Sequence, residues 1–311
     1  MKRVVQTFVL LGVGLLIGLA CYQYCLEKPA QNKGESTVIT CVTSFSVLGD
    51  FVKIIGGDEV RVISIVGPNS DAHTYEPTPQ DAKHIVQADI FFVNGLSFEE
   101  GWMGRLLNTT ETPPKVVVAT KGIKPLKALE KQNDVPDPHA WHDIAHARIY
   151  VRNITQALSN IKPEKKLLFE SRLKDYEKEL DTLDTWAKNK LAEIPKAERK
   201  FITTHDAFNY FEKYFDVKVW TLVGINTNDE ASAKDIAELI DISKREKVTA
   251  IFLENITSPR LMEQIARELD VKMDGTLYSD ALSKKDGPAP TYIRMIQHNI
   301  EQIYQALKVR T

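Results

Sequence analysis

Short apolar runs alternate with amphipathic stretches along most of the chain. The apolar runs are rich in β-branched residues, which is typical of parallel strands buried on both faces. The predicted strands are 37–43, 60–66, 88–93, 115–119, 200–204, 217–222 and 250–253. The stretches with helical character are 44–55, 79–87, 208–215, 231–246, 259–269 and 291–307. This alternation predicts an α/β fold of mainly parallel sheets flanked by helices.

One long helix is predicted near the middle of the chain. Pro163 and Pro195 bracket a segment without internal proline or glycine, whose apolar residues are spaced three and four apart. Pro163 suits the first turn of a helix, whereas Pro195 cannot continue one. At about 1.5 Å per residue this helix would be roughly 45 Å long. A coiled-coil or bundle helix would have the same pattern, but between two α/β regions we interpret it as a rigid connector of two lobes.

The first 20 residues have the pattern of an export signal. Lys2 and Arg3 precede an apolar run from Phe8 to Ala20, which is shorter than the roughly 20 apolar residues of a bilayer span. An uncleaved membrane anchor is the alternative interpretation. Under both interpretations we expect the rest of the chain to lie outside the cytoplasm, in the periplasm or on the outer face of the cytoplasmic membrane.

The chain has three cysteines, and two of them lie near this signal. Cys21 follows Ala20, but Gly18 stands where a bacterial lipobox carries an aliphatic residue, so lipidation of Cys21 and ordinary cleavage both stay open. Cys41 lies within the first predicted strand, where a buried and inert thiol is expected. The sequence therefore predicts no disulfide framework.

These patterns predict five parts of the chain. The parts are a signal peptide or membrane anchor at 1–20, a flexible tether at 21–36, an N-terminal α/β lobe at 37–162, the connecting helix at 163–195 and a C-terminal α/β lobe at 196–311.

Composition narrows the classes of function. The 311 residues include 40 Lys and Arg against 42 Asp and Glu, a net charge of −2, and 43% are hydrophobic. Such a chain is too apolar to be disordered and not basic enough for nucleic acid to be an expected partner. The composition is that of an ordinary globular protein, and we expect the protein to act as a monomer.

Four loops carry side chains that bind metals, and each follows a strand or lies beside a turn. They are DAHTYEPTP with His73, DPHAWHD with His139, TTHDAF with His205, and LYSDAL with Asp280. Ligand sites in parallel α/β sheets lie at the carboxyl ends of strands. Three imidazoles and one carboxylate from separate loops would suit a four-coordinate Zn²⁺ site. Taken alone, Asp280 would be interpreted as a helix N-cap.

A competing pair lies in the second loop. His142 and His146 stand four residues apart, a spacing that would place both imidazoles on one face of a helix. The loops therefore leave two candidate metal sites open at this point.

These motifs resemble the extracytoplasmic solute-binding proteins of zinc and manganese ABC importers. The matching stretches are DAHTYEPTP, DPHAW, TTHDAFNYF and LYSDALSKKDGPAPTYIRMIQHNI, and the resemblance extends from Ser36 to Lys308. It implies two α/β lobes joined by a long rigid helix, with the metal bound in the cleft between them. It also implies that the metal ligands are His73, His139, His205 and Asp280.

The resemblance gives the other candidate residues smaller roles. His142 and His146 match no ligand position of the family, so that pair becomes at most an accessory site. Glu76 and Asp206 lie close to ligands in the sequence and are candidates to orient them from outside the coordination sphere. His84 and His298 are interpreted as ordinary helix residues, which completes the seven histidines.

The choice of metal favours Zn(II), with Mn(II) or Fe(II) as the alternative. Manganese-binding members of the family tend to carry a carboxylate where His205 stands, and Mn²⁺ prefers more oxygen ligands than this set offers. However, segment 121–136 contains none of the histidines found in the His-rich loop of many zinc importers.

We therefore expect a protein that captures Zn(II) and delivers it to an ABC permease in the cytoplasmic membrane, and no catalytic residues. Two alternatives belong to other classes: a secreted zinc hydrolase and a surface adhesin. A catalytic zinc keeps an open coordination position, whereas four protein ligands would close the site.

Overall fold

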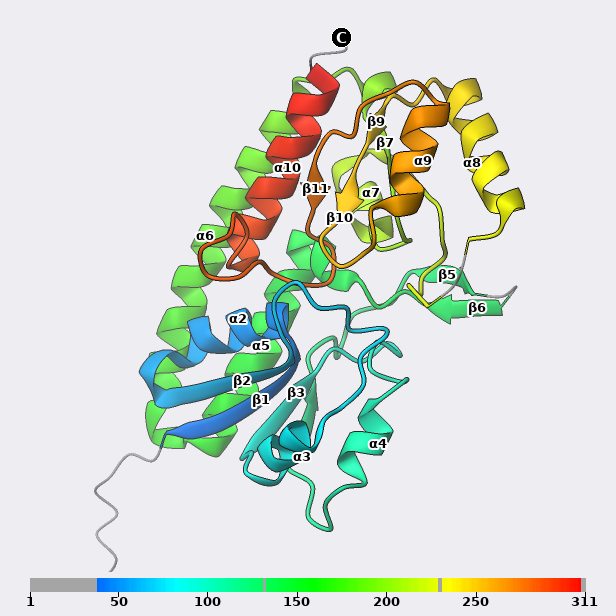
Figure 1. Ribbon diagram of the computed structural model, residues 1–311. Helices are drawn as coiled ribbons and strands as arrows, with labels where there is room; N and C mark the ends of the chain where they lie inside the picture. Colours follow the sequence, from blue (N-terminus) through cyan, green and yellow to red (C-terminus); the bar gives the residue numbers. More distant parts are fainter. Residues whose placement is uncertain (1–37, 131–132, 229–230, 309–311) are drawn as a thin grey trace, which may run out of the picture. The chain divides into compact units, whose positions relative to one another are not determined.

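Two parallel β-sheets organise this computed structural model, which describes residues 38–130, 133–228 and 231–308 (Figure 1). The predicted signal or anchor at 1–20, the tether at 21–36 and the candidate lipidation site Cys21 lie outside the described residues. The α/β fold class with two lobes and a long connecting helix is confirmed.

The N-terminal sheet has the strand order β2-β1-β3-β4, and all of its pairings are parallel. Strand β1 is central and almost wholly buried, which explains its continuous apolar and β-branched sequence. The chain order reverses between β1 and β3, the kind of place where α/β sheets bind ligands. The strands are β1 (Ile39–Phe45), β2 (Val60–Val66), β3 (Ile90–Val93) and β4 (Lys115–Val118). The helices of this lobe are α2 (Ser46–Gly56), α3 (Pro79–Val86), α4 (Met103–Leu107) and α5 (Ile144–Ile161).

The C-terminal sheet has the order β8-β7-β9 and is also parallel. Beyond its edge, β10 and β11 form a separate parallel pair. The strands are β7 (Lys200–Thr203), β8 (Lys218–Thr221), β9 (Ala250–Ile251), β10 (Leu253–Glu254) and β11 (Thr276–Leu277). The helices are α7 (Asn209–Phe215), α8 (Ala233–Glu246), α9 (Arg260–Glu268) and α10 (Tyr292–Lys308).

Smaller elements connect these layers. An antiparallel hairpin, which the sequence pattern did not predict, is formed by β5 (Lys127–Glu130) and β6 (Asn133–Pro136). The 3-10 turns are η1 (Gly57–Glu59), η2 (Ala140–His142), η3 (Pro163–Lys165) and η4 (Lys196–Glu198).

The predicted long helix is present as α6 (Lys166–Ala192), which has 27 residues and is preceded by η3. It lies along α5 and α10 and also contacts α2 (Figure 1). Its buried side chains recur at helical spacing, which places one face of the helix against both lobes. These residues are Phe169, Tyr176, Leu180, Leu183, Ala187 and Leu191.

Helix α5 was absent from the predicted elements, although it has 18 residues. Several of its residues, such as Ile149, Val151 and Thr155, have low intrinsic helix propensity. The helix forms because its apolar face is buried against α2 and α6. Asp143 caps its first turn by accepting hydrogen bonds from the backbone N–H groups of Ala145 and His146.

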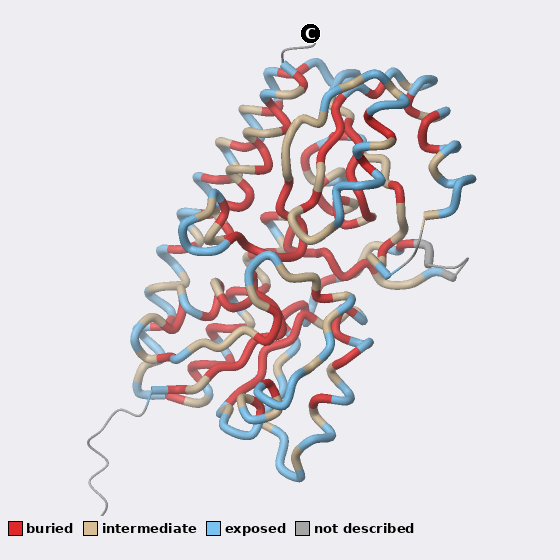
Figure 2. Tube along the Cα trace, in the orientation of Figure 1, coloured by how far each residue is buried: buried red, intermediate tan, exposed pale blue. Residues whose placement is uncertain are grey.

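The buried residues follow the central strands and the inner faces of the helices (Figure 2). One large hydrophobic cluster includes β1, β3, α6 and α10 together with Phe201 of β7, so it extends through both lobes. A second, smaller cluster joins Ile251 of β9 to α8 and α9. The shared cluster joins the described parts of both lobes into one compact unit.

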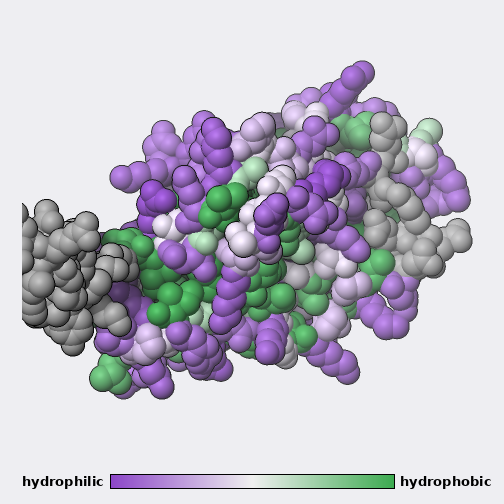
Figure 3. Space-filling view, turned by 90° about the horizontal axis from the view of Figure 1, so that it is seen from below, coloured by the Kyte–Doolittle hydropathy of each residue, from purple (hydrophilic) through white to green (hydrophobic). Residues whose placement is uncertain are grey.

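Hydrophilic side chains cover much of the surface seen from below, with hydrophobic ones gathered between them (Figure 3). Among the described residues, no helix has both the length and the apolar character needed to cross a bilayer.

Candidate metal site

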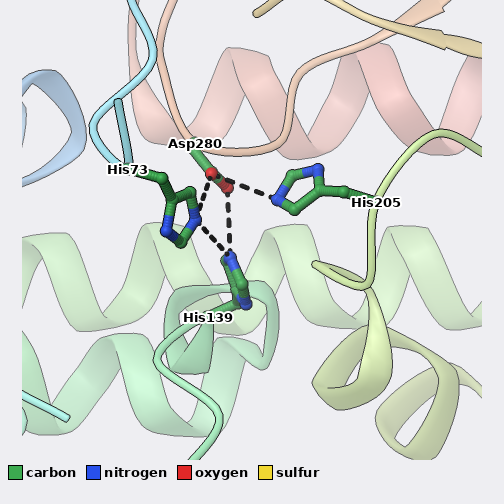
Figure 4. Close-up of side chains that lie close together, drawn as sticks. All are labelled: His73, His139, His205 and Asp280. Carbon is green, nitrogen blue, oxygen red and sulfur yellow. Dashed lines mark hydrogen bonds and ion pairs between the residues drawn. The ribbon is translucent and has the colours of Figure 1, made fainter. Parts of the chain in front are cut away.

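Four side chains converge where the two lobes meet, and all four point toward one another (Figure 4). They are His73, His139, His205 and Asp280, the set that the resemblance implied. Each offers one ligand atom, and these atoms all lie within 4.8 Å of one another.

Each side chain is placed by a different loop. His73 lies in the loop after β2, and its backbone N–H donates to Oδ1 of Asp71 at 2.8 Å. His139 stands at the start of η2, directly after the hairpin. His205 and Asp280 lie two and three residues beyond the ends of β7 and β11. The site thus lies where α/β sheets place ligands, at the carboxyl ends of strands.

Four distances between these atoms are close to those expected around a tetrahedral ion. Oδ2 of Asp280 lies 3.1 Å from Nε2 of His73 and 3.2 Å from Nε2 of His205. Oδ1 of Asp280 lies 3.6 Å from Nε2 of His139, and the Nε2 atoms of His73 and His139 are 3.3 Å apart. Ligand atoms about 2.1 Å from a tetrahedral zinc ion would be roughly 3.4 Å apart.

The burial of these groups indicates that a cation belongs between them. His139, His205 and Asp280 are fully buried. Both carboxylate oxygens of Asp280 and Nε2 of His205 lack a hydrogen-bond partner among the described residues. Because buried polar atoms are rarely left unpaired, an ion coordinated by all four groups would satisfy them. Three nitrogens and one oxygen form a donor set that fits Zn²⁺.

The buried carboxylates also favour the protonated forms of the neighbouring histidines. Burial opposes the charged form of His139, but the carboxylates of Asp280 and Asp137 outweigh it and raise the pKa of His139 to about 9. Burial likewise opposes protonation of His205, yet Glu254 and Asp280 raise its pKa well above the ordinary value. The pKa of Asp280 is held well below its usual range by the two imidazoles, against the effect of burial. Metal binding therefore has to displace protons.

Two carboxylates lie behind the imidazoles of His139 and His205, and the sequence pattern predicts neither of them. Oδ1 of Asp137 lies 2.9 Å from Nδ1 of His139, and Oε2 of Glu254 lies 2.5 Å from Nδ1 of His205. Asp137 is fully buried and Glu254 nearly so. A charged residue at the end of the apolar run AIFLE was the available signal for Glu254, and the DPH sequence was the signal for Asp137.

The two residues proposed from sequence for such a role are placed less directly. Glu76 is exposed. Asp206 hydrogen-bonds Asn209, and burial raises the pKa of Asp206 while this bond partly offsets the effect. Asn209 in turn donates to Oδ2 of Asp137 at 3.1 Å, so hydrogen bonds link Asp206 to His139 through Asn209 and Asp137.

The competing pair does not share a helix face. His142 ends η2 and His146 lies in α5, with the extended residue Asp143 between the two elements. The ring of His142 packs on Phe208 at 4.7 Å between centroids, and the ring of His146 on Tyr210 at 5.3 Å. Within the described residues, the one cluster suited to a metal is the set of four above.

The remaining histidines and Cys41 have the ordinary places expected of them. His84 lies in α3, and its Nε2 is 2.9 Å from Nε2 of Gln80. His298 lies in α10, with its Nε2 2.9 Å from the carbonyl oxygen of Thr276. Cys41 is a buried free thiol, and burial raises its pKa to about 12.

A cavity of about 280 Å³ lies beside the site and is lined in part by His73. Phe98 lines it from the N-terminal lobe, Val135 from the hairpin, and Ile225 and Asn228 from the C-terminal lobe. His73 is the one of the four side chains that lines this cavity, and it is 6% exposed whereas the other three are fully buried. The cavity therefore gives solvent its contact with the four groups on the His73 side.

Two contacts join the lobes beside this cavity. Oγ1 of Thr227 donates to Oδ2 of Asp71 at 2.6 Å, and Nδ2 of Asn228 approaches the backbone oxygen of His73 at 3.4 Å. Asp71 thus holds the His73 loop with one oxygen and the C-terminal lobe with the other.

Comparison with known proteins places these features in a family context. A family model described as zinc-uptake complex component A, periplasmic, matches residues 41–306. The manganese ABC transporter substrate-binding lipoprotein PsaA of Streptococcus anginosus is 31% identical over 304 residues, which cover 95% of this chain and 98% of that protein. The metal ABC transporter substrate-binding lipoprotein FimA of Streptococcus parasanguinis is 31% identical over 314 residues and is covered to 99%, as is this chain.

Solved structures are similar over the same region. The periplasmic zinc-binding protein TroA from Treponema pallidum matches with a TM-score of 0.82 at 30% identity, covering 87% of this chain and 99% of that one. The manganese-bound periplasmic metal-binding protein from Candidatus Liberibacter asiaticus matches with a TM-score of 0.78 at 30% identity, covering 86% and 99%.

Proposed function

The chain belongs to the family of the periplasmic zinc-uptake complex component A, and on this basis we propose that it captures Zn²⁺ at the four-residue site and delivers it to a membrane permease. As a family member it is the solute-binding protein of a metal ABC importer and not an enzyme. The family assignment sets aside the secreted hydrolase considered from the sequence.

The observation that carries the proposal is the convergence of three Nε2 atoms on one buried carboxylate. His73, His139 and His205 surround Asp280 at separations that suit one small cation. Each lobe supplies two of the four groups, so the ion would be bound in the cleft between the lobes. Its entry would follow the cavity beside His73.

The donor set supports zinc over manganese. Three imidazoles and one carboxylate favour Zn²⁺, whereas Mn²⁺ prefers oxygen ligands. Relatives are named for both metals: PsaA for manganese and TroA for zinc. Mn²⁺ is therefore the competing cargo, and competition between the two metals decides the question.

We place the protein outside the cytoplasm, acting as a monomer beside its permease. The relatives with the PsaA and FimA names are lipoproteins of ABC transporters, which supports this location. The export signal at 1–20 and lipidation of Cys21 remain part of the proposal, tested by mass measurement of the mature protein from its native host.

Calorimetric titration of the metal-free protein tests the proposed ligand set. We expect one Zn²⁺ per chain for the wild type and an affinity loss of more than about 100-fold for His205→Ala, because removing a ligand costs more than removing its hydrogen-bond partner. His84→Ala is the matched control, since His84 lies in α3 outside the site. Equal binding by wild type and His205→Ala would show that the ligand set is wrong. Tighter binding of Mn²⁺ than Zn²⁺ would reassign the cargo.

A further inference from the structure

Glu254 is held in one orientation by three donors on the same oxygen. Its Oε1 accepts hydrogen bonds from the hydroxyl of Thr203 at 2.9 Å, the backbone N–H of Thr204 at 2.9 Å and the backbone N–H of His205 at 2.8 Å. Two of these donors are backbone groups, which can donate but never accept. Whatever atom occupies the Oε1 position must therefore be an acceptor.

The other oxygen of Glu254 faces the imidazole of His205. Oε2 lies 2.5 Å from Nδ1, and both residues are almost completely buried. Two lone pairs at this distance would repel, so a proton lies between the two atoms. When the ring is neutral, a proton held on Nδ1 leaves the lone pair on Nε2, the atom that faces Asp280.

We propose that Glu254 is a positioning residue that keeps the proton of His205 on Nδ1, and so keeps Nε2 free to bind the metal. The inference rests on the proposed function, because it assigns Nε2 of His205 as a metal ligand. Glu254 is not among the four converging groups and would act on the metal through the imidazole of His205.

An amide in place of this carboxylate would reverse the arrangement. In Glu254→Gln the amide oxygen has to take the Oε1 position, because the two backbone N–H groups there require an acceptor. The NH₂ group would then face Nδ1 of His205, and the neutral imidazole would have to carry its proton on Nε2. To bind the metal through Nε2, the imidazole would have to move this proton to Nδ1 and lose its hydrogen bond with the NH₂ group.

Asp137 provides a matched control because its bonding is arranged differently. Its Oδ1 accepts from both the backbone N–H and Nδ1 of His139 at 2.9 Å, while among the described residues Oδ2 accepts from Nδ2 of Asn209 alone. In Asp137→Asn the amide oxygen can stay at Oδ1 and accept both bonds from His139. The NH₂ group would then meet the half-buried Asn209, whose side-chain amide would have to turn so that its oxygen accepts, while Nε2 of His139 stays free.

Affinity measured by competition with a chelator at pH 7.5 tests the contrast, with Zn²⁺ and Mn²⁺ each used alone. We expect Glu254→Gln to weaken Zn²⁺ binding by about 10- to 100-fold. The loss of affinity in Asp137→Asn should be at least about tenfold smaller than the loss in Glu254→Gln. Thr203→Val removes one donor but leaves both backbone donors to Glu254, so its affinity should stay near wild type. Equal losses in Glu254→Gln and Asp137→Asn, or no loss in Glu254→Gln, would overturn the proposal.

A spectroscopic measurement separates positioning from a general structural effect. In the zinc-loaded wild type, ¹H–¹⁵N NMR should show a slowly exchanging proton on Nδ1 of His205, and Glu254→Gln should lose this signal. A wild type that carries the proton on Nε2 would overturn the proposal even if Glu254→Gln failed to fold. If the wild type bound neither metal, the proposed function would fail, whereas the tautomer of His205 in the metal-free protein at alkaline pH would still test the role of Glu254.

Discussion

Nε2 of His73 lies 3.1 Å from Oδ2 of Asp280, although 207 positions separate the two residues in the chain. His73 belongs to the loop after β2 in the N-terminal lobe, and Asp280 to the loop after β11 in the C-terminal lobe. Any ion that binds both groups therefore ties the lobes together.

Metal should accordingly stabilise the folded protein. A ligand that binds only the folded state adds about 2.7 kcal/mol at 100 times its Kd. We expect Zn²⁺ to raise the melting temperature of the wild type, measured by scanning calorimetry, and to leave that of Asp280→Ala unchanged. His298→Ala, on α10 outside the site, should respond like the wild type. A shift of equal size in Asp280→Ala would contradict this prediction.

Without metal, stability should fall on the alkaline side of neutrality. The carboxylates of Asp280 and Asp137 overcome the effect of burial and raise the pKa of His139 from 6.5 to about 9. The folded state thus holds this proton more tightly than the unfolded chain, a contribution that is complete below pH 6.5 and lost as the pH rises through 9. The melting temperature of the chelator-treated protein, measured at several values between pH 6.5 and 9, checks this predicted loss of stability. In Asp280→Asn the melting temperature should decline less over this pH range. A melting temperature of the wild type that does not change with pH would contradict the prediction.

Asp50 should make the protein less stable as the pH rises from about 4 to about 6. Burial raises the pKa of Asp50 to about 6 from 3.8, and the hydrogen bond from the backbone N–H of Tyr292 only partly offsets this. The folded state then binds the proton more tightly than the unfolded state, so stability declines as the group ionises. In Asp50→Asn the amide oxygen can still accept from the backbone N–H of Tyr292. The decline in the free energy of unfolding that Asp50 causes should therefore be absent when the variant is unfolded with urea at different pH values. An unchanged pH dependence in the variant would refute the assignment.

His142 should cost stability in acid without contributing to metal binding. Burial, assisted by the charge of His139, lowers the pKa of His142 to about 3, and both ring nitrogens lack hydrogen-bond partners among the described residues. Stability from the neutral ring is present above pH 6.5 and is lost as the pH falls toward 3. His142→Phe keeps the packing on Phe208 and should unfold less readily at pH 4.5, with unchanged Zn²⁺ affinity. Weaker Zn²⁺ binding in His142→Phe would instead revive the accessory site.

Cys41 should be inert in the folded protein. Its thiol is fully buried in β1, and burial, together with the nearby charge of Asp89, raises its pKa to about 12. Since the thiolate is the reactive species, a thiol reagent should label Cys41 only after unfolding in guanidinium. A variant with serine at positions 21 and 25 leaves Cys41 as the single cysteine for this measurement. Rapid labelling of the native protein would disprove the prediction.

Most of the secondary structure could be predicted from the sequence, because strand and helix signals are local. Strand β2 was predicted with the same bounds, and α6 was recognised from its spacing and its flanking prolines. Helix α5 was not predicted, because packing against α2 and α6 outweighs its weak local propensity. The predicted strand 250–253 is divided in two, because Ile251 pairs with β7 while Leu253 pairs with β11.

The sequence by itself determined the alternation of strands and helices, and it placed three imidazoles and one carboxylate on four separate loops. Those features depend on residue type and short-range spacing, which a linear chain displays directly. Only the tertiary structure decided that Nε2 atoms from both lobes meet at Asp280, and that Glu254 and Asp137 stand behind His205 and His139. Glu254 lies 49 positions from His205, and such a contact exists only because β7, β9 and β10 bring distant segments together.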